Sequence, residues 1–231
     1  MPRSGAFTQV GSELVSLRNT ALYPTSKLDD QKFEFIFMLD ISGSMYDEPI
    51  QLAKEALLLF LQSMPADCYF NVITFQSYFK CFFPNSVKYS QETLEYAKQR
   101  VNALKAGGLT ELYKPLSHVY SQPRISGYLT QIFTITDGRV DDRDTVLELV
   151  KANVQHSRSF SLGIGDEVDR ELVIGIAENA GGTYEFVTYG EKIESKILNQ
   201  LKVSLQPGLL RPIRVNTESI LIPMYKNIEV N

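Results

Sequence analysis

The chain has 231 residues, enough for one sizeable domain with a single core but tight for two. Hydrophobic residues make up 44% of it and charged residues 22%, values typical of a globular chain and not of a disordered one. Its apolar runs fall short of the roughly 18 residues that cross a bilayer, so no membrane span is predicted. The formal net charge of −4 gives no basic field for phosphate backbones, which argues against nucleic acid as a partner.

The first strand and helix follow from the apolar pattern. Residues 33–39, FEFIFML, are continuously apolar, as in a strand covered by helices on both faces. Asp47, Glu48 and Pro49 then predict a helix start, because carboxylates and proline are favoured in the first turn. Apolar residues recur at nearly the helical period until Met64, where we expect this helix to end.

Strands at 68–75 and 78–83 are separated only by Gln76 and Ser77, so they predict an antiparallel hairpin whose second strand is a sheet edge. The elements expected after this hairpin are helices at 91–104 and 112–120, a strand at 131–136, a helix at 143–155, a strand at 159–165, a helix at 169–182, a strand at 183–188 and a helix at 191–205. This alternation predicts an α/β, Rossmann-like, doubly wound and mostly parallel sheet, with one antiparallel edge strand and helices on both faces.

The alternation defines one domain at 33–206, with flanks at 1–32 and 207–231. The C-terminal flank has β-branched residues interrupted by prolines, and both flanks are candidates for edge strands.

The two cysteines, Cys68 and Cys81, flank the predicted hairpin at unequal distances from its tip, which disfavours a disulfide between them. Residues 1–16 lack the continuous apolar segment of a secretion signal. Because unpaired thiols favour a reducing compartment, we predict a cytoplasmic location. A simpler interpretation is that both cysteines are small buried apolar residues.

Polar side chains follow two of the predicted central strands. Residues 40–44 read DISGS, so Asp40, Ser42 and Ser44 alternate along one loop, and Asp137 ends another strand in the segment TITDGR. In an open α/β sheet, ligands bind beyond the carboxyl ends of the strands where the winding reverses. We therefore expect the two carboxylates to converge there, with Thr110 of the loop AGGLTE nearby.

A small, hard dication such as Mg²⁺ takes about six oxygen ligands and keeps several waters. Asp40, Ser42, Ser44, Thr110 and Asp137 provide five oxygen-bearing side chains, of which only two are charged. The sequence therefore predicts an Mg²⁺ or Mn²⁺ site that stays electrophilic and accepts a carboxylate from a partner.

D-x-S-x-S after an apolar strand, a glycine-rich loop with threonine, and a strand-ending T-D-G resemble the metal-ion-dependent adhesion site of von Willebrand factor type A (VWA) domains. The resemblance covers roughly residues 33–206 and extends to CYFNVITF and SFSLGIGDEVDRELVIGIAENAGGTYEFV. These segments are similar to the branch with inter-alpha-trypsin inhibitor heavy chains, vault poly(ADP-ribose) polymerase and related intracellular VWA proteins. The resemblance implies a Rossmann-like domain, a divalent metal on the five residues above, and protein binding as the activity.

One position departs from the family pattern. Leu109 stands where the family usually has the second glycine of Gly-Gly-Thr. If the loop requires glycine's backbone freedom at this position, Thr110 would be displaced and metal binding weakened.

Each site residue also has a purely structural interpretation. Ser42 and Ser44 could cap the following helix, Asp137 could belong to a turn, and Thr110 could start a helix. Three further acidic residues are better explained as dipole-compensating residues at a helix start than as metal ligands: Asp141, Asp142 and Asp144. His118 and His156 have no cysteine or histidine neighbours at metal-ligand spacing, so we interpret them as ordinary helix residues.

An exposed rim beside the metal is expected to bind the partner. Its candidate residues are Met45, Tyr46, Leu112, Tyr113 and Arg139. Apolar and aromatic side chains next to a charged centre suit an interaction hot spot, although packing in the core explains Leu112 equally well.

The leading function is a non-enzymatic protein-interaction domain whose metal accepts an Asp or Glu of the partner. A haloacid-dehalogenase-type phosphatase fits less well, because Ser42 occupies the place of the second acid that this chemistry needs. No complete phosphate-binding loop is present, which argues against a nucleotide-binding enzyme. The alternative is a structural subunit of a larger assembly that uses its flanks, with an incidental metal site.

Overall fold

The structure is a computed structural model that describes residues 31–206, 211–215 and 218–222. The strands of its main sheet are β1 (Lys32–Asp40), β2 (Tyr69–Phe75), β3 (Phe79–Cys81), β4 (Val87–Lys88), β5 (Tyr128–Thr136), β6 (Ser157–Ile164) and β7 (Tyr184–Val187). The helices are α2 (Glu48–Ser63), α3 (Gln91–Asn102), α4 (Tyr113–Ser121), α5 (Arg143–Ala152), α6 (Arg170–Asn179) and α7 (Glu194–Ser204), with a short 3₁₀ turn, η2 (Gly43–Met45). These elements confirm the predicted order of strands and helices.

The main sheet has the strand order β3-β2-β1-β5-β6-β7, and β4 also pairs with β2. Strands β1, β2, β5, β6 and β7 are parallel, while β3 runs antiparallel to β2 as predicted. The two-residue strand β4 also pairs antiparallel with β2. A strand this short has no periodicity that the sequence could reveal. The architecture is the predicted Rossmann-like α/β fold.

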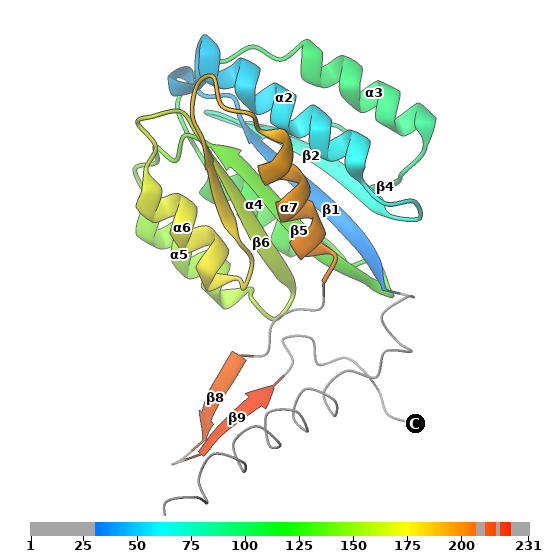
Figure 1. The fold of residues 1–231 in the computed structure, drawn as a ribbon, viewed down its shortest axis with the longest axis vertical. Coiled ribbons are helices and arrows are strands. Elements are labelled where there is room, and N and C mark those ends of the chain that lie inside the picture. The colour runs from blue at the N-terminus through cyan, green and yellow to red at the C-terminus, as the bar shows by residue number, and fades with distance from the viewer. Residues whose placement is uncertain (1–30, 207–210, 216–217, 223–231) are drawn as a thin grey trace, which may run out of the picture. The chain divides into compact units, whose positions relative to one another are not determined.

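Helices α2, α3 and α7 cover one face of the sheet, and α4, α5 and α6 cover the other (Figure 1). Strand alternation sends Phe35 and Phe37 into the first layer and Ile36 and Met38 into the second. Because both faces are covered, every position of β1 after Lys32 is buried. This double coverage explains why the first strand reads as one continuous apolar run.

Local sequence signals explain where several of the helices begin. Helix α3 begins with a capping box in which the Ser90 hydroxyl accepts from the Thr93 amide and the Thr93 hydroxyl accepts from the Ser90 amide. Pro115 lies in the first turn of α4, where its missing N–H costs nothing. Asp142 and Asp144 lie at the start of α5, as their dipole-compensating interpretation predicts.

In the C-terminal flank, β8 (Arg211–Val215) and β9 (Glu218–Ile222) form an antiparallel hairpin of their own. The strand content expected there is present, and among the described residues these strands pair with each other and not with the main sheet. The N-terminal flank at 1–32 lies outside the described residues except for its last two positions.

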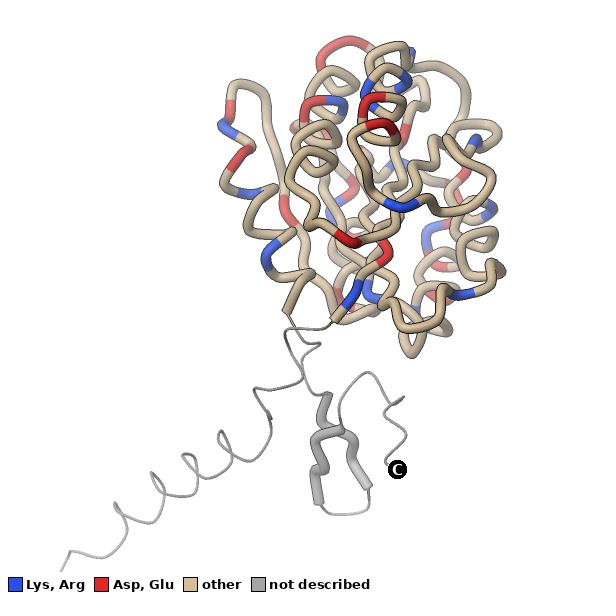
Figure 2. Tube along the Cα trace, turned by 90° about the vertical axis from the view of Figure 1, so that its right-hand side faces the viewer, with Lys and Arg blue, Asp and Glu red and all other residues tan. Residues whose placement is uncertain are grey.

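Both cysteines are free thiols, Cys68 buried and Cys81 half-buried. Burial raises the pKa of the Cys68 thiol to about 12, so this thiol is not a reactive nucleophile. Among the described helices, none is long and apolar enough to cross a membrane. Lys and Arg positions are interspersed with Asp and Glu positions along the described chain (Figure 2).

Candidate metal-binding site

The site lies where the winding of the sheet reverses. From β1 the chain proceeds to β2 on one side, and it later returns to β5 on the other side of β1. In this register Leu39 of β1 pairs with Ile135 of β5, so the carboxyl ends of the two strands are adjacent. Asp40 is the last residue of β1 and Asp137 directly follows β5. The two carboxylates therefore lie at the same sheet edge, as predicted.

Asp40 is fully buried, and both of its carboxylate oxygens accept hydrogen bonds. The Ser42 amide donates to Oδ1 at 2.8 Å, and the Thr136 hydroxyl donates to Oδ2 at 2.6 Å. Loss of hydration raises the pKa of Asp40 from 3.8 to about 6, with a further rise from the charge of Asp137, and the hydrogen bonds only partly oppose this shift. A cation near Asp40 would replace the hydration that burial removes.

The hydroxyls of Ser42 and Ser44 lie 3.1 Å apart, one buried and the other exposed. The Ser42 side chain makes no capping hydrogen bond to η2, and α2 begins after Asp47, further along the chain. Helix capping therefore does not account for the two serines. Their oxygens remain available beside Asp40.

Two backbone hydrogen bonds tie the loop that carries Thr110 to the DISGS loop. Gly43 N donates to Gly108 O at 2.9 Å, and Gly107 N donates to Ile41 O at 2.9 Å. Contacts from the β2–β3 turn hold the other side of the loop, where Leu109 N donates to the Ser77 hydroxyl at 2.9 Å. These contacts hold the loop that carries the half-buried Thr110 beside the Asp40 loop.

The leucine at position 109 imposes no backbone strain. Among the described residues, only Asp47 and Asp67 combine a side chain with a positive φ, so Leu109 does not need glycine's freedom. Its side chain is 78% exposed. The glycine that the loop does require is Gly108, with φ +84°, where a Cβ atom would lie 2.7 Å from Gln76 Oε1.

Asp137 is buried, and its Oδ1 accepts from the Arg139 amide at 3.2 Å. Thr136 links the two acidic segments, because its hydroxyl donates to Asp40 and also accepts from Gly138 N at 2.8 Å. Sequence reasoning missed Thr136. The register that places the end of β5 beside the end of β1 is the signal that would have found it.

Two of the five residues predicted for the partner-binding rim are not at the surface. Met45 and Leu112 are fully buried, because the η2 turn directs Met45 into the α2-side core and Leu112 packs in the α4-side core. These two residues were wrongly placed on the rim. Tyr46 is 71% exposed, Tyr113 is half-buried against the α4-side core, and Arg139 is exposed and ion-paired with Glu167.

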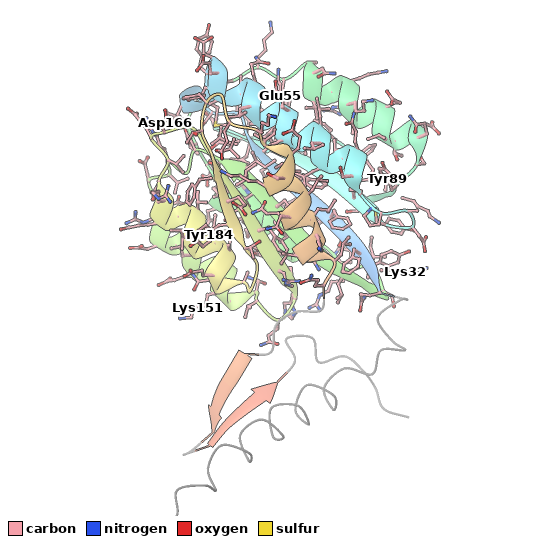
Figure 3. The ribbon with its side chains drawn as sticks, viewed as in Figure 1. Lys32, Glu55, Tyr89, Lys151, Asp166 and Tyr184 are labelled. Carbon is pink, nitrogen blue, oxygen red and sulfur yellow. The ribbon has the colours of Figure 1, made fainter. Side chains whose placement is uncertain are left out.

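A cleft of about 520 Å³ adjoins the site, and we call it the acidic cleft. It is lined by Ser44, Tyr46, Asp47, Glu48, Pro49, Asp137, Arg139, Ile164, Gly165, Asp166, Glu167 and Tyr189. Burial and four surrounding carboxylates raise the pKa of Tyr189, which reflects the negative potential of this cleft. Asp166 marks this edge of the sheet in Figure 3, opposite Lys32 at the start of β1.

The donor set suits a hard dication that retains water ligands. Within 31–206 and the two described flank strands, no three His, Cys, Asp or Glu side chains gather into a metal-binding group. The edge instead offers two carboxylates, from Asp40 and Asp137, with hydroxyls beside them. Oxygen donors of this kind match Mg²⁺ or Mn²⁺ better than metals that prefer thiolate or imidazole ligands.

The chain belongs to the von Willebrand factor type A domain family, whose profile matches residues 33–186. It is 45% identical over 184 residues to von Willebrand factor A domain-containing protein 5A of Homo sapiens, covering 75% of this chain and 23% of that protein. A von Willebrand factor A domain-containing protein of Dictyostelium discoideum is 37% identical over 198 residues, which cover 84% of this chain and 22% of the relative. The chain thus spans about a quarter of the length of these curated relatives.

Solved structures support the same fold. A von Willebrand factor type A protein from Catenulispora acidiphila superimposes with a TM-score of 0.67 at 17% identity, covering 78% of this chain and 44% of that one. Proximal thread matrix protein 1 of the mussel byssus, described with a zinc-occupied MIDAS motif, gives a TM-score of 0.59 at 16% identity, over 76% of this chain and 46% of that one. At these identities the likeness concerns the fold alone. Domains of the von Willebrand factor type A family are generally protein-interaction modules.

Proposed function

We propose that this domain binds a partner protein through a divalent cation held by Asp40, Ser42, Ser44, Thr110 and Asp137. The observation that carries the proposal is the meeting of three separate segments at one sheet edge. Backbone hydrogen bonds join the Thr110 loop to the DISGS loop, and the Thr136 hydroxyl links the Asp137 segment to Asp40. Zinc occupies the MIDAS motif of the mussel protein, which supports a metal in a domain of this fold. The oxygen donors of this chain favour Mg²⁺ or Mn²⁺.

The acidic cleft restricts the chemistry of the partner. Only two of the proposed ligands are charged, so they do not surround the dication with excess negative charge. The metal therefore stays electrophilic towards an incoming Asp or Glu. Asp47, Glu48 and Asp166 next to it repel additional negative charge. A partner that places Lys or Arg beside its metal-binding Asp or Glu satisfies both features, with the basic residue facing the acidic cleft.

A non-enzymatic role agrees with the surroundings of Asp40. Both of its oxygens accept hydrogen bonds from the protein, and its side chain is not exposed to solvent. A phosphatase nucleophile has to reach the phosphorus atom, and it needs a nearby acid where this chain has Ser42. Interaction without chemistry is the simpler function for this geometry.

Calorimetric titration of the metal-stripped chain with Mg²⁺ and Mn²⁺ tests the metal site. We expect saturable binding that Asp40→Ala abolishes and Thr110→Ala weakens, with no change in the exposed control Asp141→Ala. Absence of binding to the wild-type chain would refute the metal proposal. It would favour the structural-subunit alternative, for which the β8–β9 hairpin of the flank offers a surface.

Two capped dipeptides then test the partner chemistry on the Mn²⁺-loaded chain. We expect acetyl-Glu-Lys-amide to displace metal-bound water, observed as a loss of water-proton relaxation, and acetyl-Gln-Lys-amide to have no effect. Acetyl-Glu-Glu-amide is the control for charge, since the acidic cleft should repel its second carboxylate. Equal effects of all three peptides would contradict both the metal-bound carboxylate and the basic neighbour.

A further inference from the structure

A second pocket lies at the opposite edge of the sheet, at the amino ends of the parallel strands. Its volume is about 300 Å³, at the lower end of the range for small-ligand sites. We call it the amino-edge pocket. Its floor contains Glu34 and Ile36 of β1, Ile73 of β2, and Thr130 and Ile132 of β5. The C-terminal part of α4 and the segments that contain Ser86 and Arg124 form its walls.

Glu34 brings a buried negative charge to this floor. Its side chain is 9% exposed, and its two oxygens accept hydrogen bonds from the Ser86 hydroxyl at 2.6 Å and the Thr130 hydroxyl at 2.8 Å. Among the described residues it forms no ion pair, and the nearby bases Lys32 and Lys88 both pair with Asp67. A buried carboxylate without a counterion is costly, so Glu34 favours a cation in the pocket.

Two further polar groups at this pocket make no hydrogen bond of standard geometry. Ser157 is 3% exposed, and its hydroxyl and the buried hydroxyl of Tyr120 have only each other and the Ser159 hydroxyl nearby in the described structure. Thr130 pairs with Glu34 on one side and with Ser157 on the other, so these three residues form a row across β1, β5 and β6. Neighbouring strands are about 4.8 Å apart, which places Ser157 about 10 Å from Glu34 along the row.

We propose that the amino-edge pocket binds an aliphatic primary ammonium that carries a hydrogen-bonding group at the far end of its chain. The ammonium ion pairs with Glu34, the methylene groups cover the isoleucines of the floor, and the far polar group meets the hydroxyls of Ser157 and Tyr120. A chain of about five carbons spans this distance. Free amino alcohols have this chemistry, and so does a lysine side chain with its backbone carbonyl.

A cation fits better than an anion because the positive group of the pocket is exposed to water, whereas the negative group is buried. Arg124 is exposed to solvent, and its guanidinium contacts Nδ1 of His156. Glu34, in contrast, is shielded from water and has only hydroxyl donors. The buried charge is therefore the negative one.

Amide-resolved NMR titration of the full chain with aminopentanol tests the proposal. We expect saturable shifts at Ser86 and Thr130, whose hydroxyls donate to Glu34. Glu34→Gln should weaken this binding about tenfold or more, since a charge-assisted bond is lost. The matched control Glu55→Gln, exposed on α2 (Figure 3), should leave it unchanged. Shifts confined to Asp166 and the acidic cleft would overturn the proposal.

Isosteric probes test the binding of an ammonium group in the amino-edge pocket even if Glu34→Gln does not fold. On the wild-type chain, pentanediol should bind about tenfold more weakly than aminopentanol, and hydroxypentanoate should not bind. Binding of capped lysine as tight as that of aminopentanol assigns the site to a lysine of a protein partner. Binding of aminopentanol alone assigns it to a free amine. Failure of both amines, or equal binding of the amine and the diol, overturns the proposal.

Discussion

Asp40→Asn should stabilise the metal-free chain at pH 7 while removing its metal binding. Burial raises the pKa of Asp40 from 3.8 to about 6, so the folded chain holds this proton more tightly than the unfolded chain does. A raised carboxyl pKa provides stability at low pH, and that stability is lost as the pH rises from about 4 to about 6. Above this window the ionised carboxylate costs up to about 3 kcal/mol, because each pKa unit corresponds to about 1.4 kcal/mol.

The asparagine side chain keeps the shape of Asp40 without the charge. Its Oδ1 accepts from Ser42 N as before, and its amide group can donate to the Thr136 hydroxyl, which already accepts from Gly138 N. We therefore expect a gain of up to about 3 kcal/mol at pH 7 that shrinks towards pH 4. Asp40→Ala should not share this gain, since it leaves the buried donors of Ser42 and Thr136 unpaired.

Urea unfolding in the presence of a chelator measures this effect at pH 7 and pH 4. A gain of about 3 kcal/mol corresponds to a midpoint shift of roughly 1 M. The exposed control Asp141→Asn should change stability by no more than about 0.5 kcal/mol. If Asp40→Asn is no more stable than the wild-type chain at pH 7, desolvation of the charge does not dominate this site and the reasoning fails.

Three further predictions concern the site and its surroundings. Mg²⁺ or Mn²⁺ affinity should fall about tenfold per pH unit below about pH 6, because a proton competes with the metal for Asp40. Equal affinity at pH 7 and pH 5 in calorimetry would contradict this prediction. Gly108→Ala should weaken metal binding about tenfold or more by displacing the Thr110 loop, whereas Leu109→Gly should change metal affinity less than about twofold. A larger effect of Leu109→Gly than of Gly108→Ala would show that position 109 requires glycine. Met45→Ala should lower the free energy of unfolding by about 2–5 kcal/mol and Tyr46→Ala by no more than about 0.5 kcal/mol. If urea unfolding gives both variants a similar loss of stability, Tyr46 belongs to the core as well.

The elements that sequence patterns predicted best are those with strong periodicity or continuous apolar runs. The run at 33–39 became β1, and the alternation of strands and helices fixed the fold class. The position of Asp40 and Asp137 at one edge followed from general rules for open α/β sheets, without any knowledge of distances. The sheet edge at which a residue at the end of a strand lies is therefore predictable, because the topology fixes the direction of each strand.

The direction of side chains in the loops was less predictable. Met45 and Leu112 lie next to the site in sequence, but a single 3₁₀ turn or a helix start decides whether such residues face solvent or core. The acidic cleft was not foreseen, because Asp47 and Asp166 come together only through the packing of separate loops. The raised pKa of Asp40 likewise depends on complete burial, which a loop sequence does not reveal.

The geometry of entry and exit has a mechanical consequence. The first residue of β1 and the last turn of α7 lie at the same edge of the sheet, away from the metal-site loops (Figure 1). Arg158 reinforces this edge, donating to Gly181 O at 3.1 Å and to Gln206 O at 3.0 Å beyond the end of α7. Tension applied through both flanks would load β1, α7 and these contacts first. The three loops at the opposite edge lie off this path, so such tension would reach the proposed partner-binding site last.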